Sequence, residues 1–286
     1  MTFNLLTPNR TAADFNPAVI PSDVEFAHRV PVMAEWLAGA APDVIGLQEN
    51  EVNGSAARPV EMLAARLPGY APVLPELEVP LLVRTSAYAV GETGYQDISQ
   101  GFWRRTVAWA RLLHRSTGRE LLVLNTHLDP FQRADLARAR DAELAAVVAL
   151  LRGIDPGRRT PTVLTGDLNI RSIGLRTREA AALGRLRSCG LRDALRVAER
   201  DTSRVPGAAT LSTFGTEVDG TWRYRAIRTD RLRYDYLFVS AGVTVHGYQV
   251  VTGPRVRRIG GRPYFAETAV PSDHCPVQVD LSIPDA

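Results

Sequence analysis

The chain has 286 residues and 45% of them are hydrophobic, which is enough to bury a full core. All of the 34 basic side chains are arginine, so the formal net charge of +3 reflects residue usage as much as an anionic partner and does not by itself indicate nucleic-acid binding. Two cysteines, Cys189 and Cys275, are too few for a disulfide framework and are predicted to be reduced and packed. With no signal-peptide pattern and no apolar run of bilayer length, we expect a monomeric cytoplasmic protein that forms one domain over residues 1–286.

Short β-branched or leucine-rich runs, bounded by Gly, Pro, Asn or Asp, predict the strands. In chain order they cover residues 2–6, 44–48, 80–84, 106–113, 121–128, 161–165, 234–240, 243–251 and 277–281. Helical periodicity predicts helices over residues 23–38, 60–67, 135–151 and 176–186. Three long segments lack periodicity and are predicted to be functional loops: residues 95–105, 201–231 and 252–272.

The order of these elements predicts the fold class. Residues 115–119 join two strands with the composition of a hairpin, so part of the sheet is antiparallel. Helices separate other strands, which favours crossover connections. We therefore expect an α/β (α+β) fold, a four-layer αββα sandwich of two mixed β-sheets flanked by helices.

Polar side chains stand where several predicted strands begin or end. A carboxylate directly after a buried strand is held rigidly and faces the rim that it shares with its neighbours. Three strand-like runs end in such residues and the last strand opens with two more: Glu49, His127, Asp167, Asn169, Asp273 and His274. Carboxylate and amide oxygens suit Mg²⁺, with Mn²⁺ as the alternative, and magnesium keeps open positions for water and a phosphate oxygen. The pattern favours phosphoryl chemistry.

Six short segments carry a family resemblance. They occur in a fixed order at strand ends: residues 3–5, 42–49, 125–128, 165–169, 233–240 and 272–277. Single motifs have a high false-positive risk, whereas six in order are highly specific. On these segments the sequence resembles the endonuclease/exonuclease/phosphatase superfamily, also called the deoxyribonuclease I-like or exonuclease III-like fold, nearly end to end.

The resemblance implies a role for each matched residue. Glu49 would be the principal metal ligand, with Asn4 close by and Asp273 contributing directly or through water. Asp167 would orient or deprotonate the attacking water. Asn169 would hydrogen-bond a phosphate oxygen.

Two histidines receive roles in the same way. His274 would be the general base, with Asp235 fixing its tautomer. His127 matches a second histidine of the deoxyribonuclease I-like and sphingomyelinase-like members, which stabilises the phosphate or protonates the leaving oxygen. From the sequence alone, Asp235 could instead pair with Arg233, and Asn4 could simply satisfy backbone groups.

Substrate contacts are predicted from two arginine-containing stretches. Arg105 ends an aromatic and basic stretch, residues 102–105, that suits stacking on a substrate or the packing of a loop. Arg233 ends an arginine-rich stretch that suits phosphate recognition or a solvated loop.

The predicted function is hydrolysis of a phosphodiester or phosphomonoester, with a phosphate ester as the partner. A DNA or RNA nuclease of the same fold is the first alternative, since the shared core gives chemistry without substrate. A non-hydrolytic or repurposed biosynthetic enzyme that binds an anionic ligand is the second.

Overall fold

The computed structural model describes residues 1–9, 25–51, 57–130, 134–171, 177–203, 210–211, 213–218, 221–225, 232–252, 256–259, 262–265 and 271–284. Within these ranges, no helix has the length and apolar character needed to cross a bilayer. Both cysteines are free and buried, as predicted.

One six-stranded sheet contains the N-terminal strand. Its order is β13-β16-β1-β2-β4-β3, and only β1 and β2 form a parallel pair. The strands are β1 (Thr2–Asn4), β2 (Val44–Gln48), β3 (Tyr70–Val73), β4 (Leu81–Arg84), β13 (Thr244–Val250) and β16 (Val277–Ser282).

The second six-stranded sheet is also mixed. Its order is β5-β6-β7-β8-β12-β9, with β7 and β8 parallel and the other pairs antiparallel. The strands are β5 (Tyr88–Asp97), β6 (Thr106–His114), β7 (Glu120–His127), β8 (Thr162–Asp167), β9 (Leu191–Asp193) and β12 (Asp235–Ser240). The predicted hairpin at residues 115–119 joins β6 to β7.

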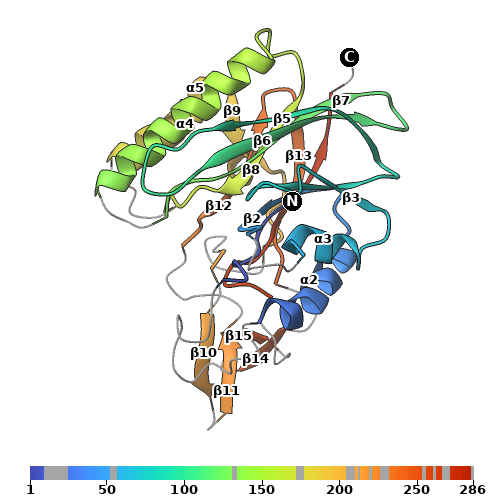
Figure 1. Ribbon diagram of the computed structural model, residues 1–286, viewed down its shortest axis with the longest axis vertical. Coiled ribbons are helices and arrows are strands. Elements are labelled where there is room, and N and C mark those ends of the chain that lie inside the picture. Colours follow the sequence, from blue (N-terminus) through green and yellow to red (C-terminus); the bar gives the residue numbers. More distant parts are fainter. Residues whose placement is uncertain are drawn as a thin grey trace.

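The two sheets pack face to face between helical layers (Figure 1). Strand β7 has an apolar sequence because both of its faces are buried. Leu121 and Val123 point into the core between the sheets, whereas Leu122 and Leu124 pack against helices. Helices α4 (Ala134–Ile154) and α5 (Thr177–Ser188) cover this sheet, and α2 (Phe26–Ala40) and α3 (Pro59–Ala64) cover the other. A short helix, α6 (Ala194–Val197), follows β9. The predicted four-layer αββα sandwich is confirmed.

A third, four-stranded sheet corrects the prediction for the long loops. Its order is β10-β11-β15-β14, and it lies below the sandwich in Figure 1. Strands β10 (Thr213–Val218) and β11 (Thr221–Arg225) fall in one segment predicted to be a loop, and β14 (Val256–Ile259) and β15 (Arg262–Phe265) fall in another. Strand β5 also enters the third such segment, because it continues to Asp97.

Candidate active site

Three polar side chains lie at the same end of three neighbouring strands in the second sheet. His127 ends β7, Asp167 ends β8, and Asp235 begins β12. The strand register places Asp167 opposite both His127 and Asp235. All three side chains are buried, so the hydrogen-bonded backbone of the sheet fixes where they stand.

Asn125 ties the two sheets together directly beneath this rim. Its side-chain nitrogen donates to the backbone oxygen of Leu47 at 2.7 Å, and its Oδ1 accepts from Gln48 Nε2 at 2.7 Å. Such close approach requires a glycine at position 46, since a Cβ there would lie 2.1 Å from Thr165 Oγ1. The two halves of the site are therefore held at a fixed separation.

From the first sheet, Glu49 and Asn4 reach the same rim. Glu49 follows β2 with a φ of 63°, a left-handed conformation that costs free energy in a non-glycine residue and is typical of functional sites. The side-chain nitrogen of Asn4 donates to Glu49 Oε1 at 3.0 Å and to Asp167 Oδ2 at 3.1 Å. The backbone N–H of Thr7 donates to Glu49 Oε2 at 2.7 Å, and that of Leu6 donates to Asn4 Oδ1 at 2.9 Å. Asn4 thus bridges two carboxylates through its nitrogen.

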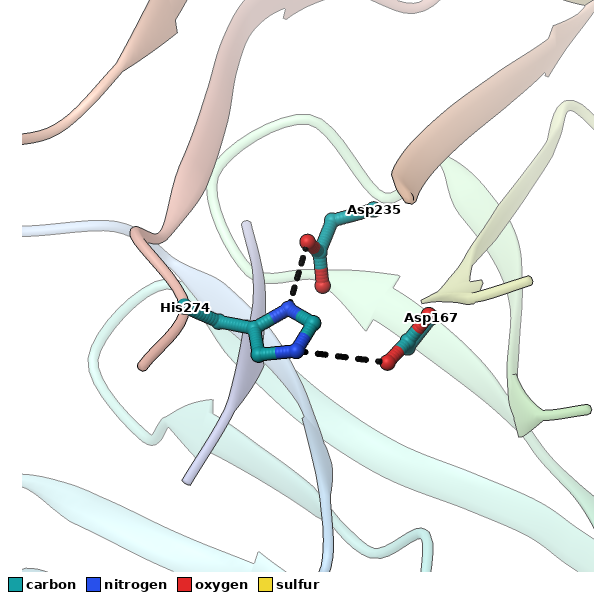
Figure 2. Close-up of side chains that lie close together, drawn as sticks. All are labelled: Asp167, Asp235 and His274. Carbon is teal, nitrogen blue, oxygen red and sulfur yellow. Dashed lines mark hydrogen bonds and ion pairs between the residues drawn. The ribbon is translucent and has the colours of Figure 1, made fainter. Parts of the chain in front are cut away.

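His274 stands between two aspartates (Figure 2). Its Nδ1 lies 2.8 Å from Asp235 Oδ2, and its Nε2 lies 3.7 Å from Asp167 Oδ2. Burial by itself would lower the pKa of His274, but the two carboxylates raise that pKa well above its usual value. Burial also raises the pKa of Asp235, against the opposing effect of His274. The predicted pairing of Asp235 with His274 is present, and the alternative partner Arg233 is not used.

His127 approaches Asp167 from the other side and has its own carboxylate partner, Glu78. His127 Nε2 lies 3.6 Å from Asp167 Oδ2, and His127 Nδ1 lies 2.6 Å from Glu78 Oε1. Burial and Arg105 lower the pKa of His127, but the carboxylates of Glu78 and Asp167 outweigh them and the net shift is upward. Glu78 Oε1 also accepts from the backbone N–H of Glu49 at 3.0 Å. Glu78 therefore joins the second histidine to the backbone of the candidate metal ligand.

Glu78 was not among the residues predicted for the site, although the sequence contains a signal for it. Strand β4 is antiparallel to β2, with Gly46 opposite Leu81. Residues just before β4 therefore lie at the same edge of the sheet as residues just after β2, such as Glu49. A carboxylate two residues before the run that starts at Pro80 was a candidate on that ground.

Arg105, which was predicted to bind substrate, lies in the wall of the cleft beside His127. Its Nη1 is 3.2 Å from His127 Nδ1 and 3.7 Å from Glu78 Oε1, while its Nε is 3.5 Å from Asp129 Oδ1. The side chain is buried. Arg105 therefore places positive charge beside the pair formed by His127 and Glu78.

Arg233 is not brought to the site, which corrects its predicted role in substrate binding. The side chain is buried, and its two terminal nitrogens donate to Asp193 Oδ1 at 2.9 Å and Oδ2 at 2.6 Å. The guanidinium also lies over the Tyr236 ring, 4.1 Å from the centroid. A guanidinium engaged by a buried carboxylate and an aromatic face serves the packing of β9 against β12.

Asn169 and Asp273 border the cluster. Asn169 has a φ of 50°; its N–H donates to Asp167 Oδ1 at 2.9 Å, and its side-chain nitrogen donates to the oxygen of Leu128 at 2.9 Å. Asp273 precedes His274 and acts on it through its charge, yet it lies outside the compact group of Asp167, Asp235 and His274. Asn169 is at the site, and Asp273 is beside it.

A cleft with a volume of about 480 Å³ opens at this rim. Its walls include both histidines, the carboxylates of the two sheets and the loop before β6: Thr7, Asn9, Glu49, Glu51, Trp103, Arg104, Arg105, His127, Pro130, Asp167, Asn169 and His274. Pockets of this size suit small ligands.

A buried charge network lies behind Arg105. Among the described residues, the Asp129 side chain accepts no hydrogen bond and pairs by charge with Arg105. The backbone N–H of Asp129 donates to Glu143 Oε2 at 3.1 Å, and its backbone oxygen accepts from Arg140 at 3.0 Å. Arg140 also donates to Glu179 at 3.3 Å, which joins α4 to α5. Burial raises the pKa of Glu143 to about 7.

Glu143 should make the protein less stable as the pH rises. Its pKa in the folded state is about 7, above the value of 4.5 for an exposed carboxyl, so the folded state binds the extra proton. The favourable contribution is full below pH 4.5 and is lost as the pH passes through 7, a total of roughly 3 kcal/mol. Urea unfolding at pH 5 and pH 8 should show a smaller loss in Glu143→Gln than in the wild type. An equal loss in both proteins would contradict the assignment.

The sequence profile of the Endonuclease/Exonuclease/phosphatase family matches residues 1–274. No curated protein sequence gives a significant match. Among solved structures, the mannosyl-6-phosphatase Bt3783 of Bacteroides thetaiotaomicron VPI-5482 aligns with a TM-score of 0.73 at 21% identity, over 99% of this chain and 98% of that one.

Two further structures show the same fold at lower identity. The human Nocturnin catalytic domain with bound sulfate aligns with a TM-score of 0.64 at 17% identity, over 98% of this chain and 91% of that one. D. rerio TDP2 complexed with a single-strand DNA product aligns with a TM-score of 0.61 at 17% identity, over 90% of this chain and 92% of that one. These likenesses show the fold, and the profile match over nearly the whole chain establishes that the protein belongs to the endonuclease/exonuclease/phosphatase family.

Proposed function

We propose that the protein is a divalent-metal-dependent hydrolase of phosphate esters. The observation that carries the proposal is the position of Asp167 Oδ2. It lies 3.7 Å from His274 Nε2, 3.6 Å from His127 Nε2 and 3.1 Å from the Asn4 nitrogen. Asp167 therefore lies between the proposed metal-binding residues, Asn4 and Glu49, and the two histidines.

Asp167 and His274 would activate the attacking water. A water held by Asp167 Oδ2 is within reach of His274 Nε2, which accepts its proton as the water attacks phosphorus. Asp235 holds His274 Nδ1 at 2.8 Å, so Nε2 is the nitrogen that faces the water. The carboxylates of Asp235 and Asp167 then stabilise the imidazolium that forms on His274.

The donor set fits a hard divalent cation. Glu49 Oε1 and Asp167 Oδ2 converge on the same nitrogen of Asn4 at 3.0 and 3.1 Å, and oxygen donors are those that Mg²⁺ and Mn²⁺ prefer. Glu49 would be the principal ligand, with Asn4 and Asp273 beside it. When bound, the ion supplies positive charge that neutralises phosphate oxygens and opposes protonation of His274.

The opposite wall of the cleft would hold the phosphate and the leaving oxygen. His127, held by Glu78, points its Nε2 toward Asp167 and can donate a proton to the leaving alcohol. Its raised pKa favours the protonated form that this step needs. Asn169 and Arg105 also line the cleft and would hydrogen-bond phosphate oxygens.

Hydrolysis assays on four substrates test this proposal. Enzyme treated with a chelator should be inactive, and added Mg²⁺ or Mn²⁺ should restore release of product. The panel contains p-nitrophenyl phosphate, bis-p-nitrophenyl phosphate, plasmid DNA and a single-stranded RNA. Turnover of the first or second without the nucleic acids supports a small-molecule phosphatase or phosphodiesterase.

Other outcomes select the alternatives. Cleavage of plasmid DNA or RNA at a rate above that of the small esters would make the protein a nuclease. Inactivity on all four substrates across both metals would favour a protein that binds an anionic ligand without hydrolysis, and it would reject the proposed reaction.

A further inference from the structure

Two large aromatic side chains are exposed beside the cleft. Phe102 is 84% exposed and Trp103 is 45% exposed. Their rings meet edge to face, with centroids 5.5 Å apart and planes at 82°. We call these two residues the aromatic pair. Side chains of this size usually bury most of their surface, and Trp103 stays exposed where it lines the cleft, so its ring is available for contact with a ligand.

The loop that carries the aromatic pair is closed at its base. The N–H of Ile98 donates to the oxygen of Arg105 at 2.9 Å, and the N–H of Arg105 donates to Ser99 Oγ at 2.8 Å. Gly101 packs directly on a buried carboxylate, because a Cβ at this position would lie 1.5 Å from Asp129 Oδ2. The tip of the loop is therefore positioned by contacts at both ends and in the middle.

The same loop ends at the catalytic machinery. Arg105 Nη1 lies 3.2 Å from His127 Nδ1, and Trp103 lines the cleft that also contains Asp167 and His274. If a phosphate ester binds with its phosphate at these side chains, Trp103 can contact the alcohol part of the ester. The whole cleft measures about 480 Å³, which suits one small molecule.

We propose that Trp103, supported by Phe102, stacks on a ring in the alcohol part of the substrate. The substrate class is then a small phosphate ester of a ring-bearing alcohol, a sugar or a nucleoside, and acyclic esters are disfavoured. A nucleobase presents a flat aromatic face and a sugar ring presents an apolar face of C–H groups, and an indole can cover either. This inference rests on the proposed function for the location of the phosphate, and it adds the chemistry of the leaving group.

Binding measurements test the proposal without requiring turnover. Isothermal titration calorimetry on the full chain carrying Asp167→Asn, with Mg²⁺ present, would compare glucose 6-phosphate, adenosine 5′-monophosphate and glycerol 3-phosphate. At least one of the two ring esters should bind about tenfold more tightly than glycerol 3-phosphate, which corresponds to roughly 1.4 kcal/mol. Which of the two binds more tightly identifies the ring.

Added to that background, Trp103→Ala should remove the preference, so that the ring esters and glycerol 3-phosphate bind within about twofold of each other. Trp103→Phe, which keeps a flat face, should retain most of the preference. Tyr95→Ala is the matched control, because Tyr95 is another exposed aromatic, 53% exposed, that lines the neighbouring hollow and not the cleft. This control should leave all three affinities unchanged.

Two results would overturn the ring subsite. One is equal affinity for all three esters in the parent protein, and the other is an equal loss for all three in Trp103→Ala. Failure of the hydrolysis assays with the ring preference intact would reject the proposed reaction and leave the subsite standing, so the two proposals fail separately.

Discussion

The His274→Ala variant should lose about three orders of magnitude in kcat while it keeps its fold. General acid-base groups contribute typically 10² to 10⁴ in rate, and His274 Nε2 is the nitrogen that faces Asp167 Oδ2, at 3.7 Å. Loss of the imidazole leaves the attacking water without a proton acceptor. Steady-state kinetics on the best ester of the assay panel, together with circular dichroism, would measure both expectations.

His246 provides the matched control for this variant. It is also a histidine paired with a carboxylate, since its Nδ1 lies 3.0 Å from Glu199 Oε2, but it lies on β13 outside the cleft. His246→Ala should keep wild-type kcat. A second variant, Asp235→Asn, should lower kcat by less than His274→Ala and shift its pH profile, because it removes the carboxylate that raises the pKa of His274. Near wild-type turnover in His274→Ala would remove the mechanism.

The Glu49→Gln variant should lose roughly 10³-fold in kcat/KM at a fixed Mg²⁺ concentration, because charge stabilisation by a catalytic metal is worth several kcal/mol. Glutamine keeps the size of the side chain and can still accept from the N–H of Thr7, so the fold should persist. The concentration of Mg²⁺ that gives half-maximal activity should rise. Titration of activity with Mg²⁺ after chelation would measure this shift.

Glu120 is the control for Glu49. It begins β7 at the end opposite His127 and pairs with Arg111 on the surface. Glu120→Gln should have the Mg²⁺ requirement of the wild type. If Glu49→Gln also had an unchanged requirement, the metal would be bound elsewhere.

The sandwich was predictable because its central strands are buried on both faces. In β12, Tyr236 and Phe238 face the helices and Leu237 and Val239 face the other sheet, so the strand is apolar without interruption. Strand β5 was missed because it is an exposed edge strand with a polar, glycine-containing sequence, and β3 was missed because it contains Pro72.

The third sheet was missed although its sequence contains a hairpin signal twice. Strands β10 and β11 are separated by two residues, Asp219 and Gly220, and the pair β14 and β15 by Gly260 and Gly261. Dipeptides of these types between strand-like runs predict antiparallel hairpins. These segments were predicted to be loops because they show neither helical periodicity nor apolar runs, and the hairpin signal was not used.

Site residues at the ends of central strands were predictable, and those that depend on tertiary contacts were not. Asp167 and His127 each end an apolar strand. Because β7 and β8 are parallel, both side chains lie at the same edge of the sheet. Glu78 precedes an antiparallel strand, so its proximity to His127 follows only from the pairing of β2 with β4. Arg233 was misplaced because no sequence pattern shows that its partner is Asp193, 40 residues earlier.

Hydrolysis in oxygen-18-labelled water tests most directly whether water activated at Asp167 attacks phosphorus. Under single-turnover conditions with Mg²⁺ and the best ester of the panel, mass spectrometry should find the label in the released phosphate and none in the alcohol. Asp167→Asn should release neither product at a comparable rate. Label in the alcohol, or unchanged release by Asp167→Asn, would contradict the account.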